Sequence, residues 1–265
     1  MKIRISVLMG IYNCEHTLVE ALDSLYAQTY QGFKIILCDD GSTDNTYEVA
    51  KSYQSKHDNI ILLKNEHNIK LAATLNRCLA YADTEYVARM DGDDISLPTR
   101  FEKEIEFLDE NPDYAVVSCA MVYFDENGDW GVGSPIAKPT KMDFKNGTPF
   151  AHAPSMTRTK VIKEVEGYTV NKYLERQEDY YLWYKIYKNN YEGYNLTDPL
   201  YKMRDDQNAM LRRTFKSRYY GFIVKKQVMS DLGIPNPLIF ALPNLLKAFV
   251  PNFLMKILRK KKMKY

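Results

Sequence analysis

Short apolar runs alternate with segments of helical periodicity through about the first 110 residues, and this alternation limits the fold more than any other feature of the chain. The apolar runs predict buried strands over residues 3–11, 33–38, 60–63 and 85–90. Helical spacing predicts helices over residues 15–28, 44–56, 72–82 and 100–108. Unbroken apolar strands that alternate with helices are typical of a parallel sheet covered on both faces. We therefore expect an α/β fold with a mostly parallel central sheet and flanking helices.

The second half of the chain has a more mixed pattern. It predicts a strand over residues 114–124, a turn at Asn127-Gly128 and a polar loop to about residue 149. Further along, it predicts a return to the sheet over residues 151–158, a helix over 177–190 and a short strand over 200–203. From residue 207 the pattern is helical, apart from a break at residues 233–237. We therefore expect the chain to end in a helical extension.

The composition is that of an ordinary globular protein. The chain has 265 residues, a mass of 30.9 kDa and a formal net charge of +2, so its bulk charge gives no reason to expect nucleic-acid binding. Its four cysteines lack the close spacing of a zinc site or a redox dithiol, which fits a reducing cytosol. The apolar run at the N-terminus is too short for a signal peptide and is better explained as a first strand.

Polar side chains follow three of the four predicted N-terminal strands. They are Tyr12-Asn13, Asp39-Asp40 and Asp91-Gly92-Asp93-Asp94. In an open α/β sheet, ligands bind in the crevice at the carboxyl ends of the strands. If the strands are parallel, these three groups face the same crevice, and we expect a ligand site there.

The acidic segment 91–94 has two interpretations when it is taken alone. Its three carboxylates repel one another, and a divalent cation with oxygen ligands would offset that repulsion. A solvated acidic turn after a strand explains the same residues equally well. A calcium loop fits less well, because its glycine and its later glutamate would be misplaced.

The other two polar segments are also ambiguous. Residues 39–44 could bind a base or a ribose, or could form a strand-to-helix turn with a capping aspartate. Tyr12 could stack on a base, although a tyrosine at a strand end is more often packed against the protein. The chain has no glycine-rich phosphate-binding fingerprint. We therefore expect any nucleotide diphosphate to be bound through a metal ion.

Taken together, several segments carry a family resemblance. In the first half they are Val7-Leu8-Met9-Gly10-Ile11-Tyr12-Asn13, Asp39-Asp40-Gly41-Ser42-Thr43-Asp44 and Arg89-Met90-Asp91-Gly92-Asp93-Asp94, with Leu97-Pro98 and Arg100. In the second half they are His152, Gly167-Tyr168, Glu178-Asp179 and Leu182-Trp183. The joint pattern resembles family 2 glycosyltransferases of the GT-A (Rossmann-like) fold. It is most similar to bacterial enzymes that build capsular or biofilm exopolysaccharide, including the EpsE type, where it extends to Gly147-Thr148-Pro149-Phe150 and Tyr201-Lys202-Met203-Arg204.

The resemblance implies a domain division and an activity. A GT-A domain would cover residues 1–205, with a nucleotide-sugar-binding half (1–110) and an acceptor half (111–205). A helical extension with a basic amphipathic tail would cover 206–265. The activity would be that of an inverting, metal-dependent hexosyltransferase (EC 2.4 type). Such an enzyme would move a sugar from a nucleotide diphosphate donor, expected to be a UDP-sugar, to a lipid-linked or oligosaccharide acceptor in exopolysaccharide or capsule biosynthesis.

The resemblance also implies roles at the donor site. Tyr12 would stack on uracil or another base, and Asp40 would hydrogen-bond to that base. Asp91 would lie near the ribose and the diphosphate. Asp93 would be the ligand of Mn²⁺ or Mg²⁺, with Asp94 close by.

Three further residues are expected to contribute to donor binding. Asn13 and Asp44 belong to the motifs that resemble the nucleotide-binding segments of the family. Lys70 stands where many relatives have glycine, and it could reach a phosphate or be a solvated lysine at a helix start. A second departure is Asp206, where many relatives have a histidine, so any role of that histidine in the family is in doubt here.

Glu178-Asp179 resembles the segment that carries the general base of inverting members. Asp179 matches the base, with Glu178 beside it, because an inverting transfer needs one carboxylate to take the proton of the acceptor hydroxyl. Acidic residues at a helix start are also favoured by the helix dipole. On the residues alone, that second interpretation is preferred.

The tail from residue 238 combines apolar side chains with the basic residues Lys256, Arg259, Lys260, Lys261, Lys262 and Lys264. Pro243, Lys247 and Pro251 interrupt its apolar stretch, so a spanning helix is not expected. A basic segment with an apolar face suits an anionic membrane surface, which predicts a cytoplasmic protein held peripherally at the inner face of the membrane. A docked helix with a frayed basic end is the alternative.

Two other classes of protein are compatible with parts of the sequence. One is a non-catalytic or bifunctional regulatory protein that binds other proteins on a glycosyltransferase scaffold, because fold does not fix function. The presence of both Asp93 and Asp179 argues against it. A nucleotidyltransferase is disfavoured, because such enzymes usually have a glycine-rich phosphate loop near the N-terminus.

Overall fold

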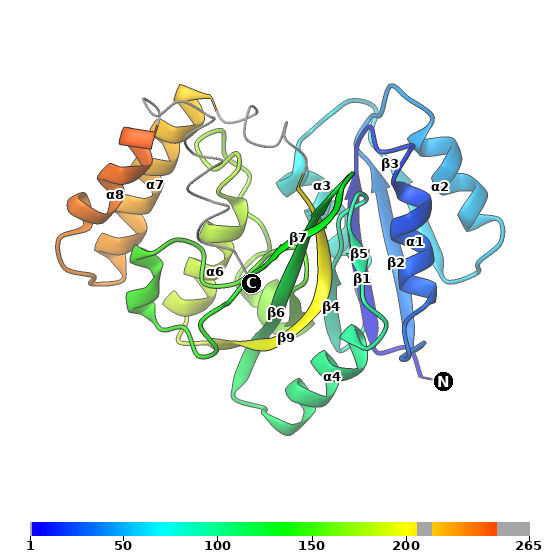
Figure 1. Cartoon of the computed structure of the whole chain (residues 1–265), viewed down its shortest axis with the longest axis horizontal. Helices are drawn as coiled ribbons and strands as arrows, with labels where there is room; N and C mark the ends of the chain where they lie inside the picture. The colour runs from blue at the N-terminus through cyan, green and yellow to red at the C-terminus, as the bar shows by residue number, and fades with distance from the viewer. Residues whose placement is uncertain (1, 206–213, 248–265) are drawn as a thin grey trace.

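The computed structural model describes residues 2–205 and 214–247. A nine-stranded sheet lies at its centre, with helices on both faces (Figure 1). The strands are β1 (Ile5–Ile11), β2 (Phe33–Asp39), β3 (Ile60–Lys64), β4 (Tyr86–Arg89), β5 (Ile95–Ser96), β6 (Tyr114–Asp125), β7 (Gly128–Val132), β8 (Met156–Arg158) and β9 (Glu192–Arg204). Their order is β3-β2-β1-β4-β8-β6-β9-β5, and β7 pairs with β6.

The first four strands confirm the predicted parallel arrangement. β1 lies between β2 and β4 and is parallel to both, and β3 is parallel to β2. β6 and β9 form a further parallel pair, and the antiparallel strand β8 joins β6 to β4. The sheet is therefore mostly parallel, with antiparallel pairs at β5, β7 and β8.

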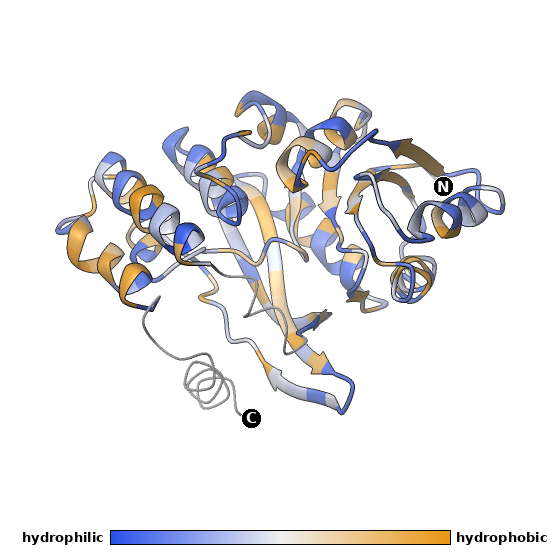
Figure 2. Ribbon diagram, turned by 90° about the horizontal axis from the view of Figure 1, so that it is seen from above, coloured by the Kyte–Doolittle hydropathy of each residue, from blue (hydrophilic) through white to orange (hydrophobic). Residues whose placement is uncertain are grey.

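Helices cover both faces of the sheet, as the apolar strands require. The helices of the described residues are α1 (Leu18–Tyr26), α2 (Thr46–Gln54), α3 (Leu71–Ala80), α4 (Arg100–Glu110), α5 (Thr159–Glu164), α6 (Glu178–Lys188), α7 (Phe215–Asp231) and α8 (Pro237–Leu246), with a 3-10 turn η1 (Lys141–Lys145). Alternate residues of β1 enter two separate cores, because successive side chains point to opposite faces. Val7 belongs to the core that includes residues of α1 and α4, and Leu8 belongs to the core that includes residues of α3 and α6. Apolar colouring runs along the central strands in Figure 2.

Strand β9 is much longer than the sequence predicts. Residues 192–199 contain Asn195, Asp198 and Pro199, which are poor strand formers. The register between β6 and β9 shifts on both sides of Ala120, which pairs with Pro199, so the irregularity accommodates the proline within the ladder. The short elements β5, α5 and η1 were also not predicted, because each is too short to show a period.

The C-terminal part has the predicted helices and break. α7 and α8 lie side by side at the end of the molecule farthest from α1 and α2 (Figure 1), and residues 232–236 join them. Pro243 lies inside α8 rather than interrupting it. The basic tail and Asp206 lie outside the described residues. No helix within those residues combines the length and the hydropathy that a bilayer crossing requires.

A buried ion pair anchors α4 under the sheet. The side chains of Arg100 and Glu104 are fully buried, with Nε donating to Oε1 over 3.2 Å. Arg100 Nη2 also donates to the carbonyl oxygen of Arg89 at the end of β4 over 2.9 Å. Glu104 Oε2 has no hydrogen-bond partner among the described residues. Burial raises the pKa of Glu104 to about 7, although Arg100 lowers it.

Replacing Glu104 with glutamine should remove a pH-dependent loss of stability. Because the folded-state pKa is raised above the ordinary value of 4.5, the group favours folding below about pH 4.5 and loses that contribution as the pH rises through about 7. We expect the free energy of unfolding of Glu104→Gln, relative to wild type, to increase by about 3 kcal/mol between about pH 4 and about pH 8.

Chemical denaturation at both pH values measures this difference. Glu106→Gln is the matched control, since Glu106 is an exposed glutamate on the same helix. A difference between wild type and Glu104→Gln that stays constant with pH would contradict the assignment.

Candidate active site

The ends of β1, β4 and β9 surround a cavity of about 390 Å³. Tyr12 and Asn13 line it after β1, Asp91 and Asp93 line it after β4, and Arg204 reaches it from β9. Because β1 and β4 are adjacent and parallel, the polar residues after each strand meet at one edge of the sheet. Residues from two of the three polar strand ends that the sequence singled out therefore line this cavity. Asp39 and Asp40 do not line this cavity.

The acidic turn contributes three carboxylates at different depths. Oxygen atoms of Asp91, Asp93 and Asp94 all lie within 4.8 Å of one another. Asp94 is buried, Asp91 is half-buried and Asp93 is exposed. Gly92 makes this packing possible, because a Cβ there would lie 2.9 Å from Cys14 Sγ on the segment after β1. The turn thus forms an acidic group in which Asp94 lies at the buried base, called the floor below, and Asp93 lies at the solvent-exposed edge, called the rim.

The electrostatics of this turn fit a divalent cation. Burial raises the pKa of Asp94 well above its ordinary value, and the charges of Asp91 and Asp93 raise it further. All the donor atoms are carboxylate oxygens, which are the ligands that Mg²⁺ and Mn²⁺ prefer. A cation bound here would offset the mutual repulsion of the three groups. The residues present therefore fit the expected metal.

Two arginines hold the acidic turn in place. The backbone N–H of Arg204 donates to Asp94 Oδ1 over 2.7 Å, and its Nε donates to the carbonyl oxygen of Asp93 over 2.9 Å. Arg89 is buried, and its Nη1 lies 2.5 Å from Asp91 Oδ1. Burial is the largest single influence on Arg89 and lowers its pKa, but Asp91, Tyr201 and Tyr168 together outweigh it and the net shift of the pKa is upward. Arg89 therefore stays charged beneath the site.

Asn13 and Asp44 fasten the loops after β1 and β2 to each other. Asn13 has a left-handed backbone (φ 49°), its N–H donates to Ser42 Oγ over 3.0 Å, and its Oδ1 accepts from the N–H of Thr43 over 2.9 Å. Asp44 Oδ1 accepts from the N–H of Thr46 over 3.0 Å. Partial burial raises the pKa of Asp44, but hydrogen bonds from Thr46, from the N–H of Glu15 and from its own N–H together lower it overall. Both residues thus shape the loop that carries Tyr12, and only Asn13 lines the cavity.

Asp40 and Lys70 meet at the start of α3. The buried Asp40 accepts from Asn65 Nδ2 (2.7 Å) and from the backbone N–H groups of Ile69 (2.8 Å) and Lys70 (3.0 Å). Its carboxylate therefore holds the loop 65–70 against the end of β2. Lys70 adopts φ 73° and ψ 159°, a region that is otherwise nearly restricted to glycine. This explains why glycine suits the position, and it directs Lys70 to a second cavity of about 530 Å³ that Glu178 also lines.

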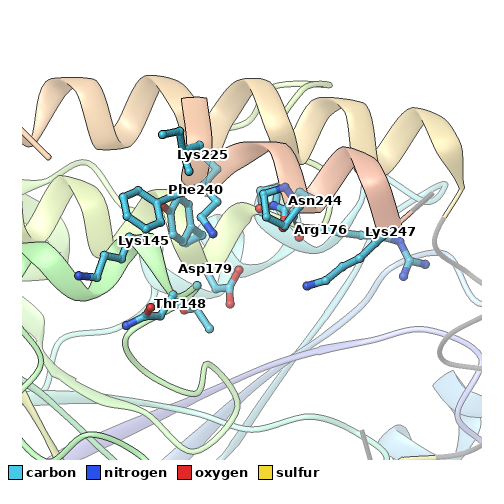
Figure 3. A pocket seen from close by; sticks show the side chains of 14 residues that line it. Lys145, Thr148, Arg176, Asp179, Lys225, Phe240, Asn244 and Lys247 are labelled. Atoms are coloured by element: carbon cyan, nitrogen blue, oxygen red, sulfur yellow. Dashed lines mark hydrogen bonds between the residues drawn. The ribbon is translucent and has the colours of Figure 1, made fainter. Parts of the chain in front are cut away.

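Glu178 and Asp179 are adjacent at the start of α6 but line different cavities. Asp179 lines a third cavity, of about 600 Å³, between η1, α7 and α8 (Figure 3). Burial raises the pKa of Glu178 to about 7, with a smaller contribution from the charge of Asp179. Neither carboxylate lines the cavity at the acidic turn. Buried Tyr168 lies within electrostatic reach of both carboxylates and of Asp91, since all three raise its pKa after the larger effect of burial.

Arg89 and Arg204 are the site residues whose roles the sequence did not reveal. Both appeared in motifs that resemble the family, but nothing in their spacing indicates which acid each one contacts. Arg204 lies more than a hundred positions from the turn that it holds. The sequence offered one signal, which is that Arg89 directly precedes the turn with the three acids.

Comparisons with known proteins point to one family. The model of "Glycosyl transferase family 2" matches residues 6–219. The chain is 40% identical over 261 residues to a protein of Bacillus subtilis (strain 168) named as a glycosyltransferase, EpsE, covering 98% of this chain and 94% of that one. It is 32% identical over 217 residues to an Escherichia coli UDP-Gal:α-D-GlcNAc-diphosphoundecaprenol β-1,3-galactosyltransferase, covering 79% of this chain and 77% of the relative.

A solved structure supports the fold independently. The crystal structure of S. aureus TarS residues 1–349 in complex with UDP-GlcNAc superposes with a TM-score of 0.69 at 21% identity, covering 93% of this chain and 71% of that one. At this level of identity the likeness shows the GT-A fold alone. The family match and the sequence relatives go further: the chain belongs to glycosyltransferase family 2 and is a glycosyltransferase.

Proposed function

We propose that this protein is an inverting, metal-dependent hexosyltransferase that transfers a sugar from a UDP-sugar to a lipid-linked acceptor during the assembly of a bacterial exopolysaccharide. The observation that carries this proposal is the acidic turn after β4, whose three carboxylates converge within 4.8 Å beside Tyr12. The similarity to the galactosyltransferase named above supports the UDP donor and the diphosphate-linked acceptor.

The donor is proposed to occupy the cavity at the acidic turn. Tyr12 lines this cavity and is 46% exposed, and its ring is proposed to stack on uracil. Asp93 at the rim would be the principal ligand of Mn²⁺ or Mg²⁺, with Asp91 beside it and Asp94 as the floor. The bound ion would offset charge that develops on the departing diphosphate. Arg204 would keep the carboxylates in place for the ion through its contacts with Asp93 and Asp94.

Asp179 is proposed as the general base. The hydroxyl oxygen of the acceptor attacks the anomeric carbon and forms the new glycosidic bond. The bond from that carbon to the diphosphate oxygen breaks, and its electron pair leaves with UDP. The proton of the acceptor hydroxyl passes to the Asp179 carboxylate. Attack from the face opposite UDP inverts the anomeric centre.

We also propose a peripheral position at the cytoplasmic face of the membrane. The lipid-linked acceptor named for the relative supports it, as does the basic composition of residues 256–264. An acceptor anchored in the bilayer requires the enzyme to work at its surface.

Replacing Asp93 with asparagine should abolish metal-dependent donor binding and turnover. The change keeps the side-chain size but removes one charge from the ligand set, so we expect Mn²⁺-dependent UDP binding to weaken by at least roughly a hundredfold. Calorimetry with UDP and Mn²⁺, together with hydrolysis assays on a panel of UDP-sugars, measures both effects.

Asp58→Asn is the matched control, because Asp58 is an exposed aspartate outside the cavity and the variant loses the same charge. Full activity of Asp93→Asn would rule out the proposed metal site. A wild-type protein that neither binds Mn²⁺–UDP nor hydrolyses any donor would instead favour a protein-binding role.

Asp179→Asn and Glu178→Gln should separate the two neighbouring carboxylates. We expect kcat of Asp179→Asn to fall by roughly 10²–10⁴-fold with UDP binding unchanged, since only proton removal is lost. Glu178→Gln should retain most of its activity.

The pH dependence sharpens this test. Glu178, with a pKa of about 7, becomes charged as the pH rises through neutrality and places a negative charge beside the proposed base. The kcat of wild type should therefore rise through about pH 7, and this step should be absent in Glu178→Gln. If Glu178→Gln is the inactive variant, the two roles are exchanged.

A further inference from the structure

The cavity that Asp179 lines is rich in positive charge. Its walls come from η1 and the segment after it, the start of α6, and helices α7 and α8. Four of its lining residues are cationic: Lys145, Arg176, Lys225 and Lys247. Asp179 is the one acidic residue among them. In Figure 3, Asp179 lies between Lys145 and Lys247, below the helix that carries Phe240 and Asn244.

Three of these cations lack an acidic partner. Within residues 2–205 and 214–247, the side chains of Lys145, Arg176 and Lys225 make no salt bridge, although the ammonium of Lys145 lies 5.7 Å from the ring centroid of Phe240. Surface lysines without partners are ordinary, but convergence of several on one hollow is not, because like charges repel. An anion bound among them would offset that repulsion.

Lys225 is the strongest indication. It projects from α7 and is only 7% exposed, so its charge is largely withdrawn from water. Burial, with a smaller contribution from the charge of Lys247, lowers its pKa to about 8. A lysine buried without an acid is destabilising unless a ligand supplies the counter-charge.

The same cavity has an apolar wall. Ile239, Phe240 and Pro243 line it from α8. Helix α8 continues this surface outward, because Leu238, Ile239, Leu242 and Leu246 are between 40% and 64% exposed. Figure 2 shows α8 as hydrophobic along much of its length. Positive charge thus lies directly beside apolar surface.

We infer that this cavity binds the diphosphate of a lipid-linked acceptor, with Lys145 and Lys225 contacting the phosphates and α8 contacting the first part of the lipid chain. The inference rests on the proposed function, because Asp179 in the same cavity is the proposed base for the acceptor hydroxyl. The donor diphosphate has a separate place at the acidic turn, whose cavity shares no lining residue with this one. A second cationic hollow beside the base therefore suits the acceptor.

Binding of octyl diphosphate to the full chain, measured by calorimetry in EDTA, tests the inference without any turnover. Wild type should bind octyl diphosphate at least about tenfold more tightly than inorganic pyrophosphate, because the chain gains apolar contacts with α8. Octyl β-glucoside, which has the chain without the charge, should not compete. Equal affinity for pyrophosphate and octyl diphosphate would overturn the lipid part of the inference.

Variants locate the site. Lys145→Gln and Lys225→Gln should each weaken octyl diphosphate binding by at least about tenfold, since each loses a charge-assisted contact. Lys226→Gln is the matched control, because Lys226 is exposed next to Lys225 on α7 and does not line the cavity. Lys145, nearer the surface, keeps the test valid if Lys225→Gln fails to fold. Equal binding by Lys145→Gln and wild type would overturn the assignment.

A competition experiment distinguishes this inference from the proposed donor site. UDP with Mn²⁺ should leave octyl diphosphate binding unchanged, whereas displacement would place both ligands in one site and contradict the inference. Loss of Mn²⁺–UDP binding in Asp93→Asn concerns the proposed function alone, so failure of either idea is separately visible.

Discussion

The contact between Arg204 and the acidic turn joins the two halves of this protein. The turn ends β4, in the part of the sheet that the first half of the chain builds, and Arg204 ends β9, the last strand. Its backbone N–H and its Nε fix Asp94 and the carbonyl oxygen of Asp93. Three carboxylates could otherwise separate to relieve their repulsion. The long pairing of β6 with β9 thus has a function: it delivers one arginine to the ends of strands that were complete about a hundred residues earlier.

Much of this arrangement could be predicted from the sequence, and the reason is the parallel sheet. Apolar runs located β1 to β4, and parallel strands place their carboxyl ends at one edge. Tyr12 and the acidic turn could therefore be expected to meet. The sequence did not show the internal contacts of Asp40, whose carboxylate accepts backbone N–H groups from residues 69 and 70. Which backbone N–H groups a carboxylate accepts from depends on the geometry of the surrounding loops, and local sequence spacing does not show that geometry.

Other features could not be predicted, for related reasons. The full length of β9 was hidden because Pro199 and its polar neighbours are tolerated only where the register with β6 shifts. Glu178 and Asp179 line different cavities because successive side chains in the first turn of α6 point in different directions. The cationic hollow under α8 joins residues from four separate segments. The spacing of residues along the sequence does not predict that these cations lie together.

Lys70 has a consequence for how the loop before α3 responds to substitution. A non-glycine residue in its backbone region is strained by about 1–3 kcal/mol, and here the N–H of Lys70 is held by Asp40. Glycine would relax the loop, but it would remove one of the three cations, Lys70, Lys172 and Arg176, that line the cavity beside Glu178. The chain thus keeps a strained backbone at Lys70, and the carboxylate of Asp40 stabilises that backbone by accepting its N–H.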